Sequence, residues 1–82
     1  MIESIKEFII HELEKKRAIP SGIDVEAYRF LDEGHIDSLA SMTFILTIED
    51  KFDIELSQEE IVSEAFRTVG GLASIVEQKL QK

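Results

Sequence analysis

Apolar residues recur along three stretches of the chain at the spacing of an amphipathic helix, in which one face repeats every three to four residues. The pattern predicts helices over residues 2–16, 38–52 and 69–80, and a short helix over residues 58–64. No stretch alternates apolar and polar residues as a half-buried strand does. We therefore predict an all-α fold, a small bundle of three longer helices and one short helix, with a long loop between helices 1 and 2.

Residues that cap helices stand at the predicted helix ends. Asp37 and Thr68 precede the second and the last helix, where a side-chain oxygen accepts hydrogen bonds from the free amides of a first turn. Ser57 and Glu60 have the spacing of a capping box and predict the start of the short helix. Pro20 lies beyond the first helix and cannot continue its hydrogen-bond ladder.

Two adjacent glycines, Gly70 and Gly71, stand near the start of the last predicted helix. Each lowers helix stability by roughly 1 kcal/mol relative to alanine. The alternative is that they permit close packing of the backbone. The long connection, residues 18–37, carries apolar residues that we expect to pin it to the core: Ile23, Val25, Tyr28, Phe30 and Leu31.

Composition narrows the class of protein. The chain has 82 residues, 44% of them hydrophobic, and no cysteine. We expect one globular domain, residues 1–82, with no disulfide framework and no thiolate chemistry of its own. The first residues do not form a signal peptide, and no apolar run approaches the length of a membrane span. A cytoplasmic protein follows as the expectation.

The net charge of −8 is concentrated in the middle of the chain. Residues 24–64 hold twelve acids against Arg29 and Lys51, a net charge of −10, whereas residues 1–17 are neutral. Such a surface disfavours nucleic acid and anionic membranes, whose phosphates need Lys and Arg. It favours basic protein partners through electrostatic steering, although acids also serve solubility alone.

The predicted helix over residues 38–52 carries two apolar faces. One face comprises Ser41, Phe44, Ile45, Ile48 and Phe52. Leu39, Met42 and Leu46 fall on the opposite face. Two explanations remain open: either the loop of residues 18–37 covers this second stripe, or the stripe is a surface on which a partner docks.

Ser38 stands at the start of this apolar helix, directly after the acid Asp37. The amides and positive potential of a helix N-terminus suit a phosphate attached there. An ordinary capping serine is the alternative that the residues alone leave open.

Two other chemistries fit the sequence less well. A hydrolase triad of His35, Asp37 and Ser38 is disfavoured, because residues so close in sequence rarely form the required chain of hydrogen bonds. No nucleophile elbow is present, and we expect His35 to be an exposed loop residue. Residues 53–64 have the length of a calcium loop, but Gln58 stands where the sharp turn requires glycine. We therefore expect neither a catalytic residue nor a metal site.

The order of these features resembles that of acyl carrier proteins over nearly the whole chain. A helix and a long loop precede Asp37-Ser38-Leu39, and an apolar helix, the acids Glu49-Asp50 and two further helices follow. The resemblance implies that a phosphopantetheinyl transferase moves a 4'-phosphopantetheine arm from coenzyme A to Ser38. It also implies that Asp37 helps to orient the magnesium-bound coenzyme A in that enzyme. The arm's thiol would carry an acyl group as a thioester, and the protein would catalyse nothing alone.

The resemblance also implies a set of partner contacts. The apolar residues that would dock partners are Leu39, Met42 and Leu46. Ile61 would border a cavity for an acyl chain. The acids that would meet basic partner residues are Glu49, Asp50, Glu59 and Glu60. The implied partners are the transferase, an acyl- or aminoacyl-activating ligase, and acyltransferase or synthase enzymes. We expect a monomer that neither binds nucleic acid nor inserts stably into membranes.

Two departures separate the chain from carriers of fatty-acid synthesis, which usually read Leu-Gly-Ala-Asp-Ser-Leu. Here Gly34 lies one residue further from the serine, as in D-alanyl and peptidyl carriers. Ala40 and Thr43 stand where housekeeping carriers place acids. We therefore predict a specialised acyl carrier of fatty-acid, polyketide or related biosynthesis. The alternatives are a D-alanyl, aminoacyl or peptidyl carrier and, from another class, an unmodified helical interaction domain.

Overall fold

Helices make up the regular structure of the computed structural model, which describes residues 2–81, Ser38 through its backbone only. The elements, in chain order, are α1 (Ile2–Glu14), η1 (Val25–Ala27), α2 (Ser38–Phe52), α3 (Gln58–Ile61), η2 (Ala65–Arg67) and α4 (Val69–Leu80), where η denotes a 3-10 turn. Within the described residues no strand is found. The predicted all-α bundle of three longer helices and one short helix is confirmed.

Helices α2 and α4 have the predicted bounds, whereas α1 and α3 end earlier than predicted. The chain leaves α1 after Glu14, although Lys15 N still donates to His11 O at 3.1 Å. Helix α3 stops at Ile61 instead of continuing to residue 64. The Ser63 hydroxyl donates to Glu60 O at 2.7 Å, a local bond that competes with helix continuation, and the chain then forms η2, which the sequence did not predict.

The predicted caps are confirmed. Asp37 Oδ1 accepts from Ala40 N at 2.8 Å, and Thr68 Oγ1 accepts from Gly71 N at 3.0 Å. Ser57 and Glu60 form the reciprocal capping box, with Glu60 N donating to Ser57 Oγ at 3.1 Å and Ser57 N donating to Glu60 Oε1 at 2.8 Å. Each cap satisfies amides that lack a partner within the helix, so the helix starts are determined locally.

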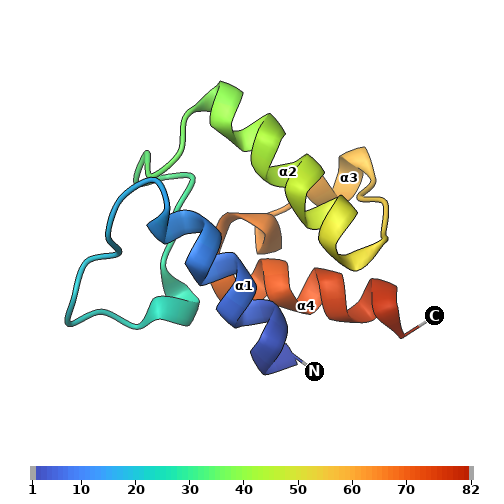
Figure 1. Cartoon of the computed structure of the whole chain (residues 1–82), viewed down its shortest axis with the longest axis horizontal. Helices are drawn as coiled ribbons and strands as arrows, with labels where there is room; N and C mark the ends of the chain where they lie inside the picture. The colour runs from blue at the N-terminus through green and yellow to red at the C-terminus, as the bar shows by residue number, and fades with distance from the viewer. Residues whose placement is uncertain (1, 82) are drawn as a thin grey trace.

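Helices α1 and α4 pack against each other, and α2 lies across them, with α3 near the C-terminal end of α2 (Figure 1). The long loop closes the side of the bundle at which α1 ends and α2 begins (Figure 1). The core draws on all of these segments: Ile5, Ile9 and Leu13 from α1, Phe44 and Ile48 from α2, Val69, Leu72, Ala73 and Val76 from α4, Phe66 from η2, and Tyr28, Phe30, Ile36 and Leu56 from the connections.

A row of three phenylalanines occupies the centre of this core. The Phe30 ring lies 5.6 Å from the Phe44 ring and 6.4 Å from the Phe66 ring, measured between centroids. Phe30 belongs to the loop, Phe44 to α2 and Phe66 to η2, so the row joins three segments distant in sequence. The expectation that apolar loop residues pin the connection to the core is met by Phe30 and Tyr28, which are both buried, while Ile23 is exposed.

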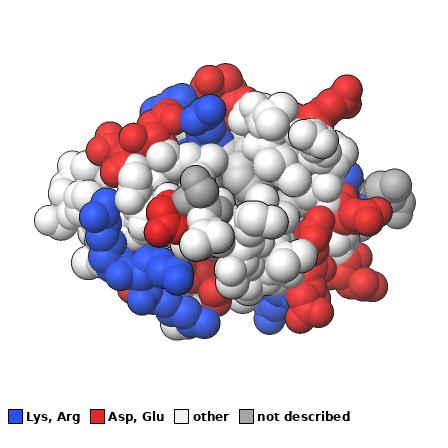
Figure 2. Space-filling model, turned by 90° about the horizontal axis from the view of Figure 1, so that it is seen from above, with Lys and Arg blue, Asp and Glu red and all other residues white. Residues whose placement is uncertain are grey.

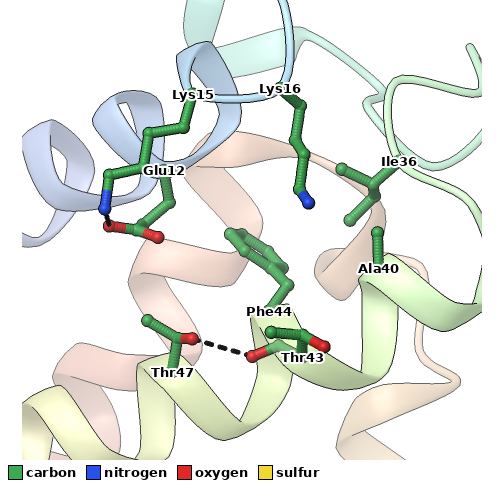
Figure 3. Close-up of a pocket in the computed structure, with 8 residues that line it drawn as sticks. All are labelled: Glu12, Lys15, Lys16, Ile36, Ala40, Thr43, Phe44 and Thr47. Atoms are coloured by element: carbon green, nitrogen blue, oxygen red, sulfur yellow. Dashed lines mark hydrogen bonds and ion pairs between the residues drawn. The ribbon is translucent and has the colours of Figure 1, made fainter.

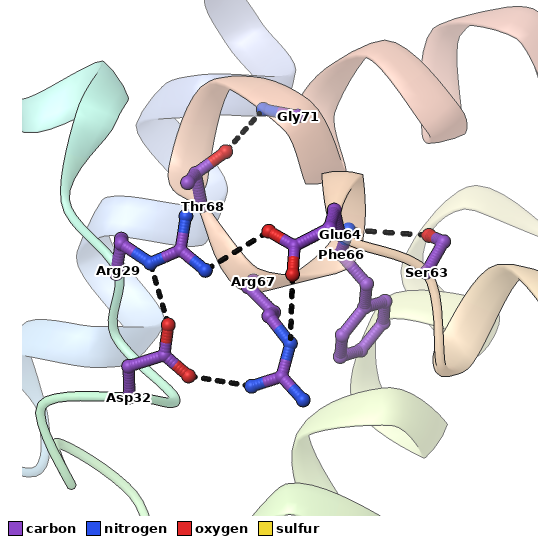
Figure 4. A network of polar contacts seen from close by, with 8 residues as sticks. All are labelled: Arg29, Asp32, Ser63, Glu64, Phe66, Arg67, Thr68 and Gly71. Atoms are coloured by element: carbon purple, nitrogen blue, oxygen red, sulfur yellow. Dashed lines mark hydrogen bonds and ion pairs between the residues drawn. The ribbon is translucent and has the colours of Figure 1, made fainter.

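Charged side chains fasten the same loop to η2. Arg29 binds Asp32 and Glu64, and Arg67 binds Asp32, which places two guanidinium groups and two carboxylates in one network (Figure 4). The hydrogen bond from Arg29 is the main cause that lowers the pKa of Asp32 below its usual range. All four side chains are more than a third exposed, so each pair adds little stability and the network chiefly sets the loop's position.

Candidate functional site

The turn before α2 sets where that helix begins. Gly34 has a φ of +71°, a left-handed conformation that glycine adopts without steric cost. His35 N donates to Phe30 O at 3.0 Å and Gly34 N donates to Leu31 O at 3.2 Å, which closes the turn. The chain then buries Ile36, and extended Asp37 caps the helix that starts at Ser38. The residues between Gly34 and Ser38 therefore belong to an ordered turn that leads into α2.

His35 is buried, with 5% of its surface exposed, so the expectation of an exposed loop residue is wrong. Its Nε2 lies 2.8 Å from Leu13 O and its Nδ1 lies 2.8 Å from the Tyr28 hydroxyl. Because a carbonyl oxygen only accepts, Nε2 donates to Leu13, and Nδ1 accepts from Tyr28 in the neutral ring. The imidazole thus adds a hydrogen bond to Leu13 O, which also accepts from Lys16 N at 3.0 Å and from Arg17 N at 3.3 Å just beyond the end of α1.

This arrangement also rules out the triad chemistry considered from the sequence. Both ring nitrogens of His35 are engaged by Leu13 and Tyr28, so neither faces Ser38 as a general base. The Asp37 carboxylate is likewise engaged, through its bond to the Ala40 amide. His35 therefore serves the packing of the turn, and Asp37 serves the cap of α2.

The start of α2 suits a phosphate group. A helix leaves its first amides without intrahelical acceptors and carries partial positive charge at that end. Asp37 takes up the amide of Ala40, and Ser41 N donates to Asp37 O at 2.8 Å, which leaves the amides of Ser38 and Leu39 without an acceptor inside the helix. These free donors suit a phosphate group at the start of α2.

The second apolar stripe of α2 is exposed. Leu39, Met42 and Leu46 are 80%, 64% and 62% exposed, so the explanation that the loop of residues 18–37 covers them is wrong. Val62, at the end of α3, is 68% exposed and was not singled out from the sequence. Seen from above, the face over α2 is largely uncharged, with acidic and basic side chains at its margins (Figure 2).

The four acids predicted to meet partners fall into two groups. Glu49 accepts from Leu56 N at 2.8 Å, and Glu60 binds both the Ser57 amide and Lys79 Nζ at 2.8 Å. The hydrogen bond from Lys79 is the largest cause that lowers the pKa of Glu60. Asp50 and Glu59 are exposed, and among residues 2–81 they form neither a side-chain hydrogen bond nor an ion pair. Of these four acids, Glu49 and Glu60 hold parts of the fold together, whereas Asp50 and Glu59 do not.

A cavity of about 180 Å³ opens between the end of α1 and the first half of α2 (Figure 3). Its lining residues are Glu12, Lys15 and Lys16 near the end of α1, Ile36 before α2, and Ala40, Thr43, Phe44 and Thr47 on α2. Ile61, predicted to border an acyl cavity, is half-buried against the core and does not line this one. The sequence did not reveal the cavity, because it depends on how the end of α1 meets α2.

Comparisons with known proteins agree with this geometry. Residues 19–76 match the family model of the phosphopantetheine attachment site. The chain is 35% identical over 79 residues to an acyl carrier protein of Streptococcus thermophilus, covering 96% of this chain and 95% of that relative. It is 34% identical over 79 residues to an acyl carrier protein of an Exiguobacterium species, covering 92% and 98%. The chain therefore belongs to the acyl carrier protein family.

Membership of this family defines the kind of protein. It is a carrier and not a catalyst, and its prosthetic group is a covalently attached 4'-phosphopantetheine. The phosphate-compatible start of α2 lies within the matched residues. No helix within residues 2–81 has the length and apolar character needed to cross a membrane.

Proposed function

We propose that Ser38 carries the phosphopantetheine arm and that the protein presents acyl groups to enzymes of fatty-acid, polyketide or related biosynthesis. The observation that carries the proposal is the exposed apolar stripe on the helix that Ser38 begins. Leu39, Met42 and Leu46 are each more than half exposed, which is an unusual use of apolar side chains unless a partner covers them.

Ser38 supplies the oxygen nucleophile in its own modification. That oxygen forms a bond to the phosphorus that carries pantetheine in coenzyme A, and the pyrophosphate bond breaks. Adenosine 3',5'-bisphosphate leaves with the electron pair, and the serine proton passes to a base of the transferase. The attached arm supplies a thiol for thioester formation. Asp37 is proposed to help orient magnesium-bound coenzyme A, and its exposed position leaves it accessible to the transferase.

Partner recognition is proposed to combine the apolar stripe with nearby acids. Asp50 and Glu59 are available for pairing with basic partner residues. Glu49 and Glu60 are engaged in contacts within the fold and contribute negative electrostatic potential. The partners are the phosphopantetheinyl transferase, an activating ligase, and acyltransferase or synthase enzymes in the cytoplasm. A carrier must leave each enzyme in turn, and a small surface of this kind suits weak, transient binding by a monomer.

A D-alanyl, aminoacyl or peptidyl carrier is the second candidate. The observation in its favour is Gly34, four residues before Ser38, in the left-handed turn that leads to α2. Both candidates use the same arm on Ser38, so loading of the arm does not separate them. Incubation of the holo protein with candidate ligases, ATP and either fatty acids or amino acids does, because the mass of the thioester product identifies the cargo.

The proposal is tested by intact mass before and after incubation with coenzyme A, magnesium and a broad-specificity phosphopantetheinyl transferase. We expect wild-type protein that is not already modified to gain one phosphopantetheine, which peptide mapping places on Ser38. Ser38→Ala should keep the helical circular dichroism spectrum and gain nothing. Ser41→Ala, one turn further along α2, is the matched control and should be modified as wild type. Modification of Ser38→Ala would overturn the assignment.

A further inference from the structure

We propose that His35 is a positioning residue for attachment of the arm. Its imidazole fastens the turn before α2 to the end of α1, and so holds the first turn of α2, at which Ser38 stands, in one ordered geometry. The inference rests on the proposed function of Ser38 as the attachment point. Because His35 is buried, it acts through the backbone of the turn and not through contact with coenzyme A.

A single polar bond ties the turn of residues 34–37 to the rest of the helical bundle. The backbone amides of Gly34 and His35 donate to carbonyls of the same loop, at 3.2 and 3.0 Å. Asp37 bonds to the first turn of α2. Within the described part of the chain, the 2.8 Å bond from His35 Nε2 to Leu13 O is the one hydrogen bond that joins this turn to α1, α3 or α4.

Both partners of this bond are held in place. Leu13 is fully buried at the end of α1, and its oxygen also accepts from two backbone amides that follow the helix. On the other side of the imidazole, the Tyr28 hydroxyl lies 2.8 Å from Nδ1, and the two rings meet edge to face at 5.5 Å between centroids. A donor at Nδ1 keeps the ring proton on Nε2, the nitrogen that faces Leu13. The ring therefore has one orientation and one tautomer.

The order of this turn bears on the reaction at Ser38. Helix ends fray, and Asp37 caps Ala40 N only while its own backbone stays extended. Attachment of the arm requires the serine oxygen to meet phosphorus in line with the bond that breaks, and a misplacement of about 1 Å can slow such a step by about a hundredfold. Met42 and Leu46 lie further along α2, so a loosened turn leaves most of the docking stripe intact.

Two substitutions of His35 separate the two bonds of its imidazole. The amide nitrogen of glutamine lies as many bonds from Cα as Nε2 does, so His35→Gln can still donate to Leu13 O. The amide of asparagine ends at the position of Nδ1, so His35→Asn keeps the contact with Tyr28 and loses the tether to α1. Val76→Ala is the control for lost stability, because it removes buried methyl groups from α4, outside the turn.

The transferase assay follows arm attachment by intact mass at saturating coenzyme A, with the carrier concentration varied, at a temperature where circular dichroism shows each variant folded. Modification of wild type at Ser38 is established first, so a failure of the proposed function is recognised separately. We expect His35→Asn to lower kcat about tenfold with less than about a twofold change in KM for the carrier, and His35→Gln to stay within about threefold of wild type. Val76→Ala should keep the wild-type kcat, even where it lowers unfolding free energy as much as His35→Asn does.

An unchanged kcat for His35→Asn, or equal losses of kcat for His35→Asn and Val76→Ala, would overturn the proposal. So would a raised KM at unchanged kcat, which would assign the effect to docking. Should His35→Asn not fold, Tyr28→Phe replaces it. Without the hydroxyl the tautomer is no longer fixed, so kcat should fall about threefold at unchanged KM, and a kcat equal to that of wild type would count against His35.

Discussion

Gly71 lies where the start of α4 passes the backbone of η2. A Cβ atom at this position would come within 2.1 Å of Ala65 O and 2.8 Å of Ala65 C. Both neighbours are backbone atoms, which cannot move aside as the end of a long side chain can. The close approach anticipated as one explanation of the glycine pair is therefore confirmed for Gly71. Helix propensity alone would predict the opposite effect of an alanine here.

Gly71→Ala should destabilise the protein by about 2 kcal/mol, because overpacking outweighs the gain of roughly 1 kcal/mol in helix propensity. Gly70→Ala is the matched control, since its added Cβ would lie 3.1 Å from Glu26 O, a tight contact that propensity offsets. Its unfolding free energy should stay close to that of wild type. Urea unfolding followed by circular dichroism measures both, and equal effects of the two substitutions would contradict the explanation.

Helix α2 joins the core and the outer surface within a single element. Phe44 and Ile48 are buried, while Leu39, Met42 and Leu46 face outward. These three side chains keep most of their surface exposed, so they contribute little to the core. Under the proposed function the stripe binds partners, so substitutions in it should separate binding from stability.

Leu46→Glu should lower kcat/KM for modification by the phosphopantetheinyl transferase by about tenfold, because a charge replaces a central docking side chain. Its unfolding free energy should change by no more than about 0.5 kcal/mol, as for other surface positions. Ile23→Glu, at an exposed apolar residue of the loop, is the control and should affect neither quantity. Unfolding of Leu46→Glu would show instead that the stripe belongs to the core.

Substitutions of the acids on α2 and α3 should distinguish those that bind partners from those that stabilise the fold. The double variant Asp50→Asn with Glu59→Gln should raise KM for the transferase several-fold at low salt and leave stability unchanged, because both side chains are exposed and outside the internal contacts. Glu60→Ala should lower the unfolding free energy by roughly 0.5–1.5 kcal/mol, the net contribution of a hydrogen bond. Steady-state kinetics at several salt concentrations measures KM, and urea unfolding measures stability. Equal stability losses for the double variant and Glu60→Ala would contradict this distinction between the acids.

Over the whole molecule, two paired carboxylates link stability to acid pH. Hydrogen bonds from Arg29 and from Lys79 are the main causes that lower the pKa values of Asp32 and Glu60. A carboxylate whose folded pKa is depressed contributes stability that is complete above its unfolded pKa, about 4. That contribution is lost as the pH falls through the lower folded pKa. Acidification below about pH 4 should therefore weaken the contacts between the loop and η2 and between α3 and α4.

Asp32→Asn should reduce the loss of unfolding free energy on acidification from about pH 4.5 to about pH 2.5, since the variant lacks the group that becomes protonated. Asp50→Asn is the control, because Asp50 is exposed and forms no side-chain hydrogen bond or ion pair among residues 2–81. Chemical denaturation at a series of pH values measures the slopes. Identical slopes for wild type and Asp32→Asn would remove Asp32 from this account.

Local signals explain which elements the sequence predicted correctly. The starts of α2 and α4 follow from Asp37 and Thr68, whose cap bonds span three residues. The early end of α3 was missed because Ser63 bonds back to Glu60, a competing local bond that the apolar pattern does not record. Apolar periodicity extends a helix for as long as it persists, whereas side-chain bonds of this kind stop it.

The sequence by itself determined the all-helical class, the starts of three helices and the position of Ser38 at the first turn of α2, because periodicity and caps act over a few residues. Only the tertiary structure decided that His35 is buried, that the stripe of Leu39, Met42 and Leu46 is uncovered, and that Lys16 faces a cavity. Those outcomes depend on where the end of α1 and the long loop settle against α2. Contacts between segments so distant in sequence are set by packing of the whole core, which no local pattern encodes.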